Sequence, residues 1–185
     1  EIHERLVGSE MCIRDRYYVV SLIGKTLVLL IAPINTIVIS YLTKRKERLT
    51  RSQFGKAVLA GGGVSLAFFV ACQIGTPLFV WLFYRNLYES VKGIVTVVNL
   101  AQILGLFSAF LFILVLTFTD ERWQLWIQLA HFCILLVSSV LAARTYGMMG
   151  FAVASLGANS LRVAAVVILG IVKAGKDKGD RNADR

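Results

Sequence analysis

The chain has few of the residues that break helices, bind metals or form active sites. It holds two prolines, three cysteines and two histidines among 185 residues. The cysteines, at positions 12, 72 and 133, show no C-x-x-C spacing and no partner histidine pattern, so they indicate neither a zinc site nor a redox motif. We expect no paired-carboxylate site, since Glu47, Glu89, Asp120 and Glu121 all lie in predicted loops, and no Ser/His/Asp or H-E-x-x-H pattern occurs. We therefore expect no enzyme, no catalytic residue, no metal and no cofactor.

Charged residues are scarce as well, and they gather in short segments. The chain is 57% hydrophobic and 17% charged, with a mean hydropathy of +0.70. A typical soluble domain is roughly 45–50% apolar and about 25% charged. The net charge of +9 comes from short loops and the C-terminal tail, and no basic face is interleaved with aromatic residues. This pattern predicts membrane lipids as partners and argues against nucleic acid.

Five apolar stretches each reach the roughly 20 residues that a transmembrane helix needs. We expect spans at residues 17–42, 54–83, 93–118, 123–143 and 147–172. The second is too long for one straight span, so we expect Gly75, Thr76 and Pro77 to break it and residues 78–84 to form a short interfacial helix. The predicted fold class is all-α, a polytopic membrane helix bundle of about five transmembrane helices over residues 17–173.

Basic residues are distributed unevenly between the two ends of these spans. The segment 43–56, TKRKERLTRSQFGK, carries six of them against one glutamate. Counted over alternate ends, 12 basic residues lie on the side of that loop and three on the other. Because cytoplasmic loops are rich in Lys and Arg, this count predicts an external start at Tyr17 and a cytoplasmic C-terminus. The polar tail, residues 174–185, is expected to be cytoplasmic and disordered.

The first sixteen residues have a different character from the rest of the chain. Residues 7–16 read VGSEMCIRDR, which resembles the translated read-through of a widely used sequencing adapter. We therefore expect residues 1–16 to be a non-native segment and exclude them from fold reasoning. On this interpretation Tyr17 is where the native sequence resumes, and the native protein continues upstream of it.

Two cations, Lys25 and Arg162, lie inside the predicted spans. Charges within a membrane are costly and usually functional. No Asp or Glu occurs inside any predicted span, so neither cation has a carboxylate partner there. Lys25 either snorkels to the outer interface or faces a water-filled cavity and meets an anion. Arg162 lies closer to the middle of its span, where snorkelling is harder, so we expect it to face a cavity.

Other residues within the spans are candidates for a hinge or for lining a cavity. Pro33 removes one backbone hydrogen bond, which produces either a static kink or a hinge used in transport. The polar candidates either hydrogen-bond between helices or line a cavity, and packing is the more common role for such side chains. They are Asn35, Asn99, Gln102, His131 and Asn159.

Three segments together resemble a known group of transporters. The first is LLIAPINTIVISYL, with its mid-helix proline. The second is TPLFVWLFYRNLYES, which ends the span that follows the basic loop. The third is YGMMGFAVASLGANSLR in the fifth span. Residues 17 to about 173 resemble the C-terminal half of polysaccharide-biosynthesis flippases, the O-antigen and capsule repeat-unit transporters of the multidrug/oligosaccharidyl-lipid/polysaccharide exporter superfamily. Pro33 and Tyr88 match the family pattern, whereas Arg85 or Asn86 stands where glycine is common.

The resemblance implies a two-lobe transporter of which this chain supplies most of the second lobe, with an N-terminal lobe missing. It also implies a multi-pass protein of the bacterial cytoplasmic membrane that flips undecaprenyl-diphosphate-linked oligosaccharide repeat units by alternating access. Cations in a wet cavity suit such a diphosphate, so Arg162 first and Lys25 second are the expected substrate contacts. Two alternatives stay open: a cation-coupled drug or metabolite exporter of the same superfamily, and a non-transporting membrane subunit.

Overall fold

The protein is seen in a computed structural model that describes residues 17–29, 31, 33, 35–40, 51–116, 119 and 121–183, with the backbone alone at 87, 121 and 174–183. The predicted non-native segment and most of the basic loop lie outside these residues. Every regular element in the described part is a helix, and this part contains no strand. The all-α class predicted from sequence is therefore confirmed.

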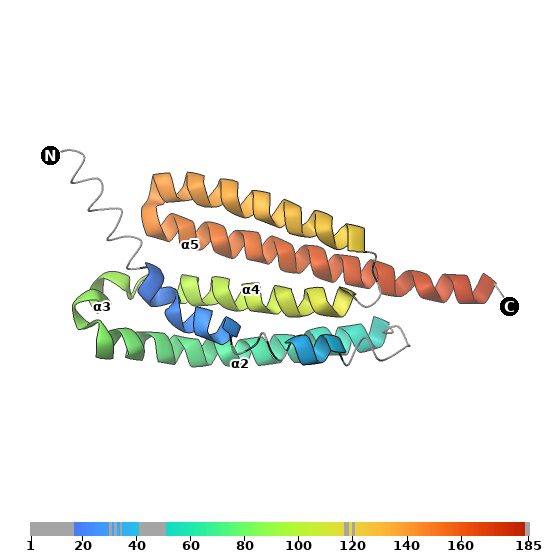
Figure 1. The fold of residues 1–185 in the computed structure, drawn as a ribbon, viewed down its shortest axis with the longest axis horizontal. Coiled ribbons are helices and arrows are strands. Elements are labelled where there is room, and N and C mark those ends of the chain that lie inside the picture. The colour runs from blue at the N-terminus through green and yellow to red at the C-terminus, as the bar shows by residue number, and fades with distance from the viewer. Residues whose placement is uncertain are drawn as a thin grey trace.

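The helices are long and run side by side. In chain order, after an apolar helix at Tyr17–Leu29, they are α2 (Arg51–Phe83), α3 (Arg85–Val91), α4 (Val95–Leu116) and α5 (Glu121–Ala183). All but α3 lie along the long axis of the molecule, and α3 sits at one end (Figure 1). The 22 residues of α4 correspond to about 33 Å at about 1.5 Å per residue, close to the roughly 30 Å hydrocarbon core of a bilayer.

Three of the described helical stretches are long and apolar enough to cross a membrane. They are Arg51–Phe83, Val95–Leu116 and Arg122–Lys173, while the apolar helix Tyr17–Leu29 is shorter. The chain is thus compatible with a membrane protein. The expected number of about five spans is not established by these helices, because the first predicted span is described only in part.

The helix at the second predicted span is longer than expected from the sequence. We expected a break at Gly75, Thr76 and Pro77, but α2 continues through Pro77 to Phe83. The expected short helix at 78–84 is therefore wrong. The chain leaves the helical conformation at Tyr84 instead, with φ −132° and ψ 48°, and the short helix that follows is α3.

Polar contacts from α4 reach the turn of α2 that precedes Pro77, although neither of them goes to the Gln73 carbonyl, which Pro77 leaves without its helical N–H partner. A proline removes one backbone hydrogen bond, and transmembrane helices compensate when a neighbouring helix supplies polar contacts. Here Asn99 of α4 donates a hydrogen bond to the carbonyl oxygen of Cys72 at 3.1 Å, and Thr76 donates one to the Asn99 amide oxygen at 3.2 Å. Such tertiary contacts cannot be seen in a local sequence window.

A single glycine divides α5 into two arms. Gly147 has φ 60° and ψ −139°, and the arms 121–146 and 148–183 turn back on each other there (Figure 1). This backbone conformation is essentially restricted to glycine. Three residues on, a Cβ atom at Gly150 would overlap the carbonyl oxygen of Ala142, so the arms approach closely beside the turn. The sequence analysis placed the boundary between its fourth and fifth spans next to this turn.

The backbone of α5 continues as helix to Ala183, through a segment that the sequence predicts to be disordered. Adding residues to an existing helix is much easier than starting one, because each further residue forms one hydrogen bond without a new nucleus. The prediction of disorder used the composition of the segment alone and did not consider the helix that precedes it.

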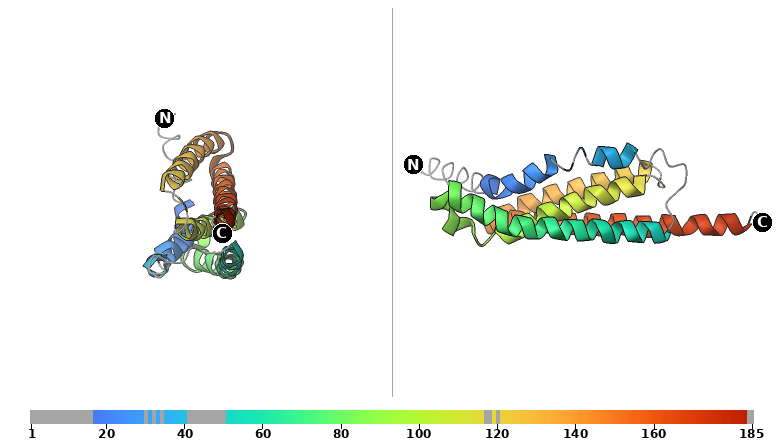
Figure 2. Two further views of the ribbon diagram at one scale, coloured as in Figure 1. Left: turned by 90° about the vertical axis from the view of Figure 1, so that its right-hand side faces the viewer. Right: turned by 90° about the horizontal axis from the view of Figure 1, so that it is seen from below.

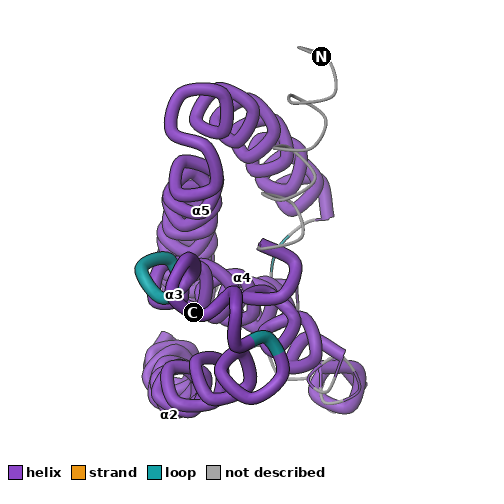
Figure 3. The backbone as a smooth tube through the Cα atoms, turned by 90° about the vertical axis from the view of Figure 1, so that its left-hand side faces the viewer, coloured by secondary structure: helices purple, strands orange, loops and turns teal. Residues whose placement is uncertain are grey.

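The buried core is centred on α4. In its most apolar window 39% of the residues are buried, against 6% for α2 and for α5. The end-on views place α4 between α2 and α5 (Figures 2 and 3). One core cluster forms around Val20, Val80 and Val98, and another around Phe54, Leu111 and Val166. The outer faces of α2 and α5 expose large apolar side chains, which suits a lipid environment.

Basic residues occur at both ends of the bundle. Arg51 begins α2 and Arg122 stands at the start of α5, and these two helix starts lie at the same end (Figure 1). Arg85 begins α3 and Arg144 precedes the turn of α5, and both of these elements lie at the opposite end. Which end faces the cytoplasm stays a prediction.

Candidate functional site

Polar contacts join α4 to three neighbouring helices, two through its own side chains and one through a backbone carbonyl. Thr96, Asn99 and Gln102 follow each other at three-residue spacing, and each step rotates the side chain by about 60° around the helix. Asn99 consequently contacts α2, while Gln102 contacts the helix Tyr17–Leu29. A third side of α4 receives a hydrogen bond from α5. Hydrogen bonds therefore connect α4 with α2, with the helix Tyr17–Leu29 and with α5.

Asn99 is 1% exposed, and its side-chain amide is fully used in these contacts. Its nitrogen donates to the Cys72 carbonyl and to Oε1 of Gln73, at 3.1 and 3.0 Å, and its oxygen accepts from Thr76. Gln73 in turn donates to Oγ1 of Thr96 at 2.9 Å. Of the two roles left open by the sequence, these contacts are those of a packing residue.

Gln102 joins α4 to the first helix at a point where glycine permits close approach. Its amide nitrogen donates to the carbonyl oxygen of Ser21 at 3.1 Å. A Cβ atom at Gly24 would overlap the end of the Gln102 side chain, so a larger residue would displace that amide from its present position. Small residues of this kind are common where membrane helices pack.

His131 and Asn159 connect the two arms of α5 with α4. Asn159 donates to the carbonyl oxygen of Ala101 at 2.8 Å, and its amide oxygen lies 3.2 Å from Nε2 of His131. Because that oxygen can only accept, Nε2 of His131 must carry the proton. The Asn159 side chain passes close to Gly105 of α4, where a Cβ would lie 3.4 Å from it, an ordinary van der Waals distance. These bonds also fit a packing role.

Arg162 lies one helical turn beyond Asn159 and completes a group that we call the α5 polar cluster: His131, Asn159 and Arg162. The Arg162 side chain is half-buried, and its guanidinium carbon stands 5.6 Å from the centre of the Phe112 ring. Its Nε is buried and has no hydrogen-bond partner among the described residues. A guanidinium held this way can still form charge-assisted bonds to an anion.

Lys25 has a different environment from Arg162. It is exposed, and its ammonium lies 4.5 Å from the centre of the Tyr18 ring on the same helix. The two predicted substrate contacts, Lys25 and Arg162, pack on different aromatic rings. Lys25 lies over Tyr18, whereas Arg162 lies near Phe112. Exposure on an outer face fits the snorkelling interpretation of Lys25 better than the cavity interpretation.

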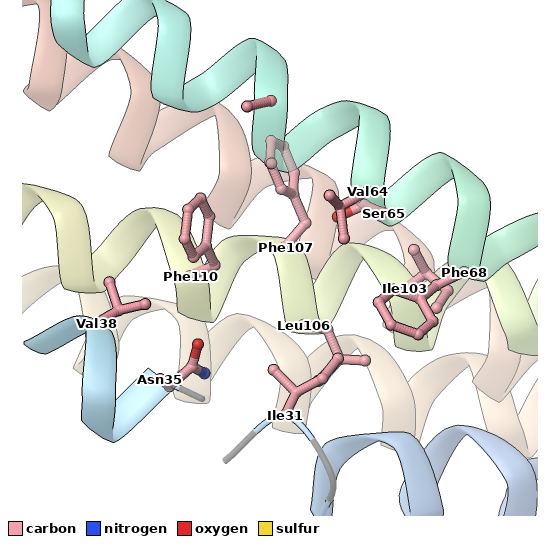
Figure 4. A pocket seen from close by; sticks show the side chains of 12 residues that line it. Ile31, Asn35, Val38, Val64, Ser65, Phe68, Ile103, Leu106, Phe107 and Phe110 are labelled. Carbon is pink, nitrogen blue, oxygen red and sulfur yellow. The ribbon is translucent and has the colours of Figure 1, made fainter. Parts of the chain in front are cut away.

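A groove of about 260 Å³ lies between α2, α4 and the residues Ile31, Asn35 and Val38 (Figure 4). Asn35, one of the cavity-lining candidates, is among its lining residues, and its role in transport stays a prediction. Apart from Asn35 and Ser65, the lining is apolar: Ile31, Val38, Ala60, Gly61, Val64, Phe68, Ile103, Leu106, Phe107 and Phe110. Neither Lys25 nor Arg162 is among these residues. Pro33 is exposed and helical.

Several partners in these contacts were not singled out from the sequence. Gln73 and Thr76 lie three residues apart on α2, just before Pro77, and that spacing could have marked a polar stripe. The backbone carbonyls of Ser21, Cys72 and Ala101 carry no sequence signal at all. Their involvement depends only on where neighbouring helices cross.

Among the described residues no group of three or more His, Cys, Asp or Glu side chains could hold a metal ion. Comparison with protein-family models, with curated proteins and with solved structures found no match to this chain. The function is therefore inferred from the residues described above.

Proposed function

We propose that this chain is part of a membrane transporter that flips undecaprenyl-diphosphate-linked oligosaccharide units across the bacterial cytoplasmic membrane by alternating access. The observation that carries the proposal is the environment of Arg162. The side chain is half-buried within the helix bundle, stacks near Phe112, and has a buried Nε without a partner among the described residues.

The charge of Arg162 has no carboxylate to balance it nearby in the sequence. No Asp or Glu occurs from Arg122 to Lys173, in α2 or in α4. An unpaired buried charge is strongly unfavourable, so such a guanidinium is best explained by an anionic ligand that pairs with it. A diphosphate suits it especially well, because a guanidinium binds phosphate oxygens through two parallel hydrogen bonds.

The depth of Arg162 also supports transport rather than binding at the surface. It precedes Lys173 by roughly 16 Å of helix, about half of the roughly 30 Å hydrocarbon core. A cation at that depth compensates a diphosphate midway through its passage. On this proposal the N-terminal lobe completes the cavity, the C-terminus is cytoplasmic, and Lys25 is at most a secondary contact.

The test uses the full-length transporter in cells that depend on it for surface polysaccharide. Arg162→Ala is expected to abolish surface polysaccharide at an unchanged level of protein in the membrane. Arg162→Lys should restore part of the export, because lysine keeps the charge but cannot form two parallel bonds. Arg144→Ala is the control, since Arg144 is an exposed cation beside the turn of α5. Full export by Arg162→Ala would refute the proposal.

One observation favours a second candidate, a non-transporting membrane subunit. Lys25 is exposed and stacks on Tyr18, as expected for a cation that snorkels from a helix facing lipid. A subunit of this kind would need no cation in its interior. Surface polysaccharide that is lost in Arg162→Ala but kept in Lys25→Ala favours the transporter, and polysaccharide kept in both favours the subunit.

A further inference from the structure

We propose that the groove between α2, α4 and the residues Ile31, Asn35 and Val38 binds one acyl chain of an anionic membrane phospholipid, with the phosphate of its head group at Lys56. This inference requires only that the helices lie in a membrane. It is independent of the transport proposal and of Arg162, which does not line the groove.

The lining of the groove favours hydrocarbon over water. Asn35 and Ser65 are its only polar residues, and the other ten lining residues are apolar or glycine. A buried water needs about two to four polar partners, so water does not fill such a site well. An acyl chain there displaces water that has only these two polar lining residues to bond.

The shape of the groove depends on a glycine and on aromatic rings from α4. A Cβ atom at Gly61 would overlap the ring of Phe110 and would lie 3.3 Å from the ring of Phe107. The missing side chain lets both rings pack against α2, where they form a wall together with Phe68 of α2 (Figure 4). Rigid rings of this kind preserve a narrow channel when lipid is absent.

The charge near one end of the groove selects the head group. Lys56 is exposed and precedes the lining residue Ala60 by four residues, about 6 Å along α2. Arg51 begins the same helix, and no acidic residue occurs between Arg51 and Phe83. Basic residues at the membrane surface attract anionic lipids. The chain therefore offers positive charge beside the opening and an apolar channel behind it.

The size of the groove argues against a protein occupant. An α-helix with its side chains is about 10–12 Å wide, which does not fit a groove of about 260 Å³. A hydrocarbon chain is narrower than a helix, and part of it can lie in such a groove. We therefore commit to a lipid, and a second copy of the chain is an outcome that the test can reveal.

The test is native mass spectrometry of the full chain in detergent, with palmitoyl-oleoyl phosphatidylglycerol or palmitoyl-oleoyl phosphatidylcholine added. These lipids share acyl chains and differ in charge. The wild type should retain one phosphatidylglycerol and much less phosphatidylcholine. Val64→Trp fills the groove and should abolish retention, whereas Leu66→Trp, at an exposed position outside the lining, should not. Circular dichroism verifies that both variants are equally helical.

The head group is tested separately. Lys56→Gln should weaken phosphatidylglycerol retention about fivefold, the usual effect of one cation at a membrane surface. Lys92→Gln, which alters an exposed cation after α3 at the opposite end, should leave retention unchanged. Three results would overturn the proposal: wild-type retention by Val64→Trp, equal retention of the two lipids, or a second copy of the chain bound in place of lipid.

Discussion

Replacing Asn159 with alanine removes one polar contact that joins the second arm of α5 to α4 and another that joins the two arms of α5. The side chain donates to the Ala101 carbonyl at 2.8 Å and contacts Nε2 of His131 at 3.2 Å. Interhelical hydrogen bonds in membrane proteins contribute about 0.6 kcal/mol on average and at most about 1.7. Losing two of them should lower the free energy of unfolding by about 1.2 kcal/mol, and by no more than about 3.4.

A double-mutant cycle isolates the contact between the two arms. Unfolding of the chain in mixed detergent micelles is measured for Asn159→Ala, His131→Ala and the double variant. The coupling energy should be about 0.6 kcal/mol. Ser160→Ala is the matched control, because Ser160 is exposed and bonds only within its own helix, to Leu156. A coupling energy of zero would refute the assignment of the Nε2 proton and the packing role of His131.

Two glycines give further predictions. Gly147→Ala should destabilise the chain by about 1–3 kcal/mol, because its φ of 60° and ψ of −139° suit only glycine, while Gly157→Ala within the second arm should be neutral or stabilising by up to about 1 kcal/mol. The same micelle assay measures both, and equal effects would contradict the turn. Gly24→Leu should release the first helix from α4, seen as faster proteolysis near residue 24, whereas Gly63→Leu at an open position should not.

The sequence predicted the helical class because an apolar run of bilayer length crosses a membrane as a helix, which satisfies its own backbone hydrogen bonds. It also placed a span boundary beside Gly147, where a glycine interrupts two such runs. It failed at Pro77, because a proline does not always end a membrane helix when neighbouring helices supply polar contacts. A polar contact to the turn before it comes from Asn99 on α4, which is 27 positions from Cys72 in sequence.

The candidate site was predictable in residue type but not in grouping. Asn99, Gln102, His131 and Asn159 were singled out because polar side chains are rare in apolar spans. Their partners could not be predicted, since three of them are backbone carbonyls that become available only where helices cross. The sequence ranked Arg162 above Lys25 by depth in the span, but it could not predict their neighbours, Phe112 and Tyr18.

The charge at Arg162 is tested most directly by the rate at which reconstituted full-length transporter moves an undecaprenyl-diphosphate oligosaccharide across a vesicle membrane. An uncompensated charge at the centre of a membrane helix costs about 2.5–3.5 kcal/mol on insertion scales, which corresponds to a rate roughly 100-fold lower. We predict a loss of about that size for Arg162→Ala and a partial recovery for Arg162→Lys. A wild-type rate for Arg162→Ala would contradict the proposed role of this residue.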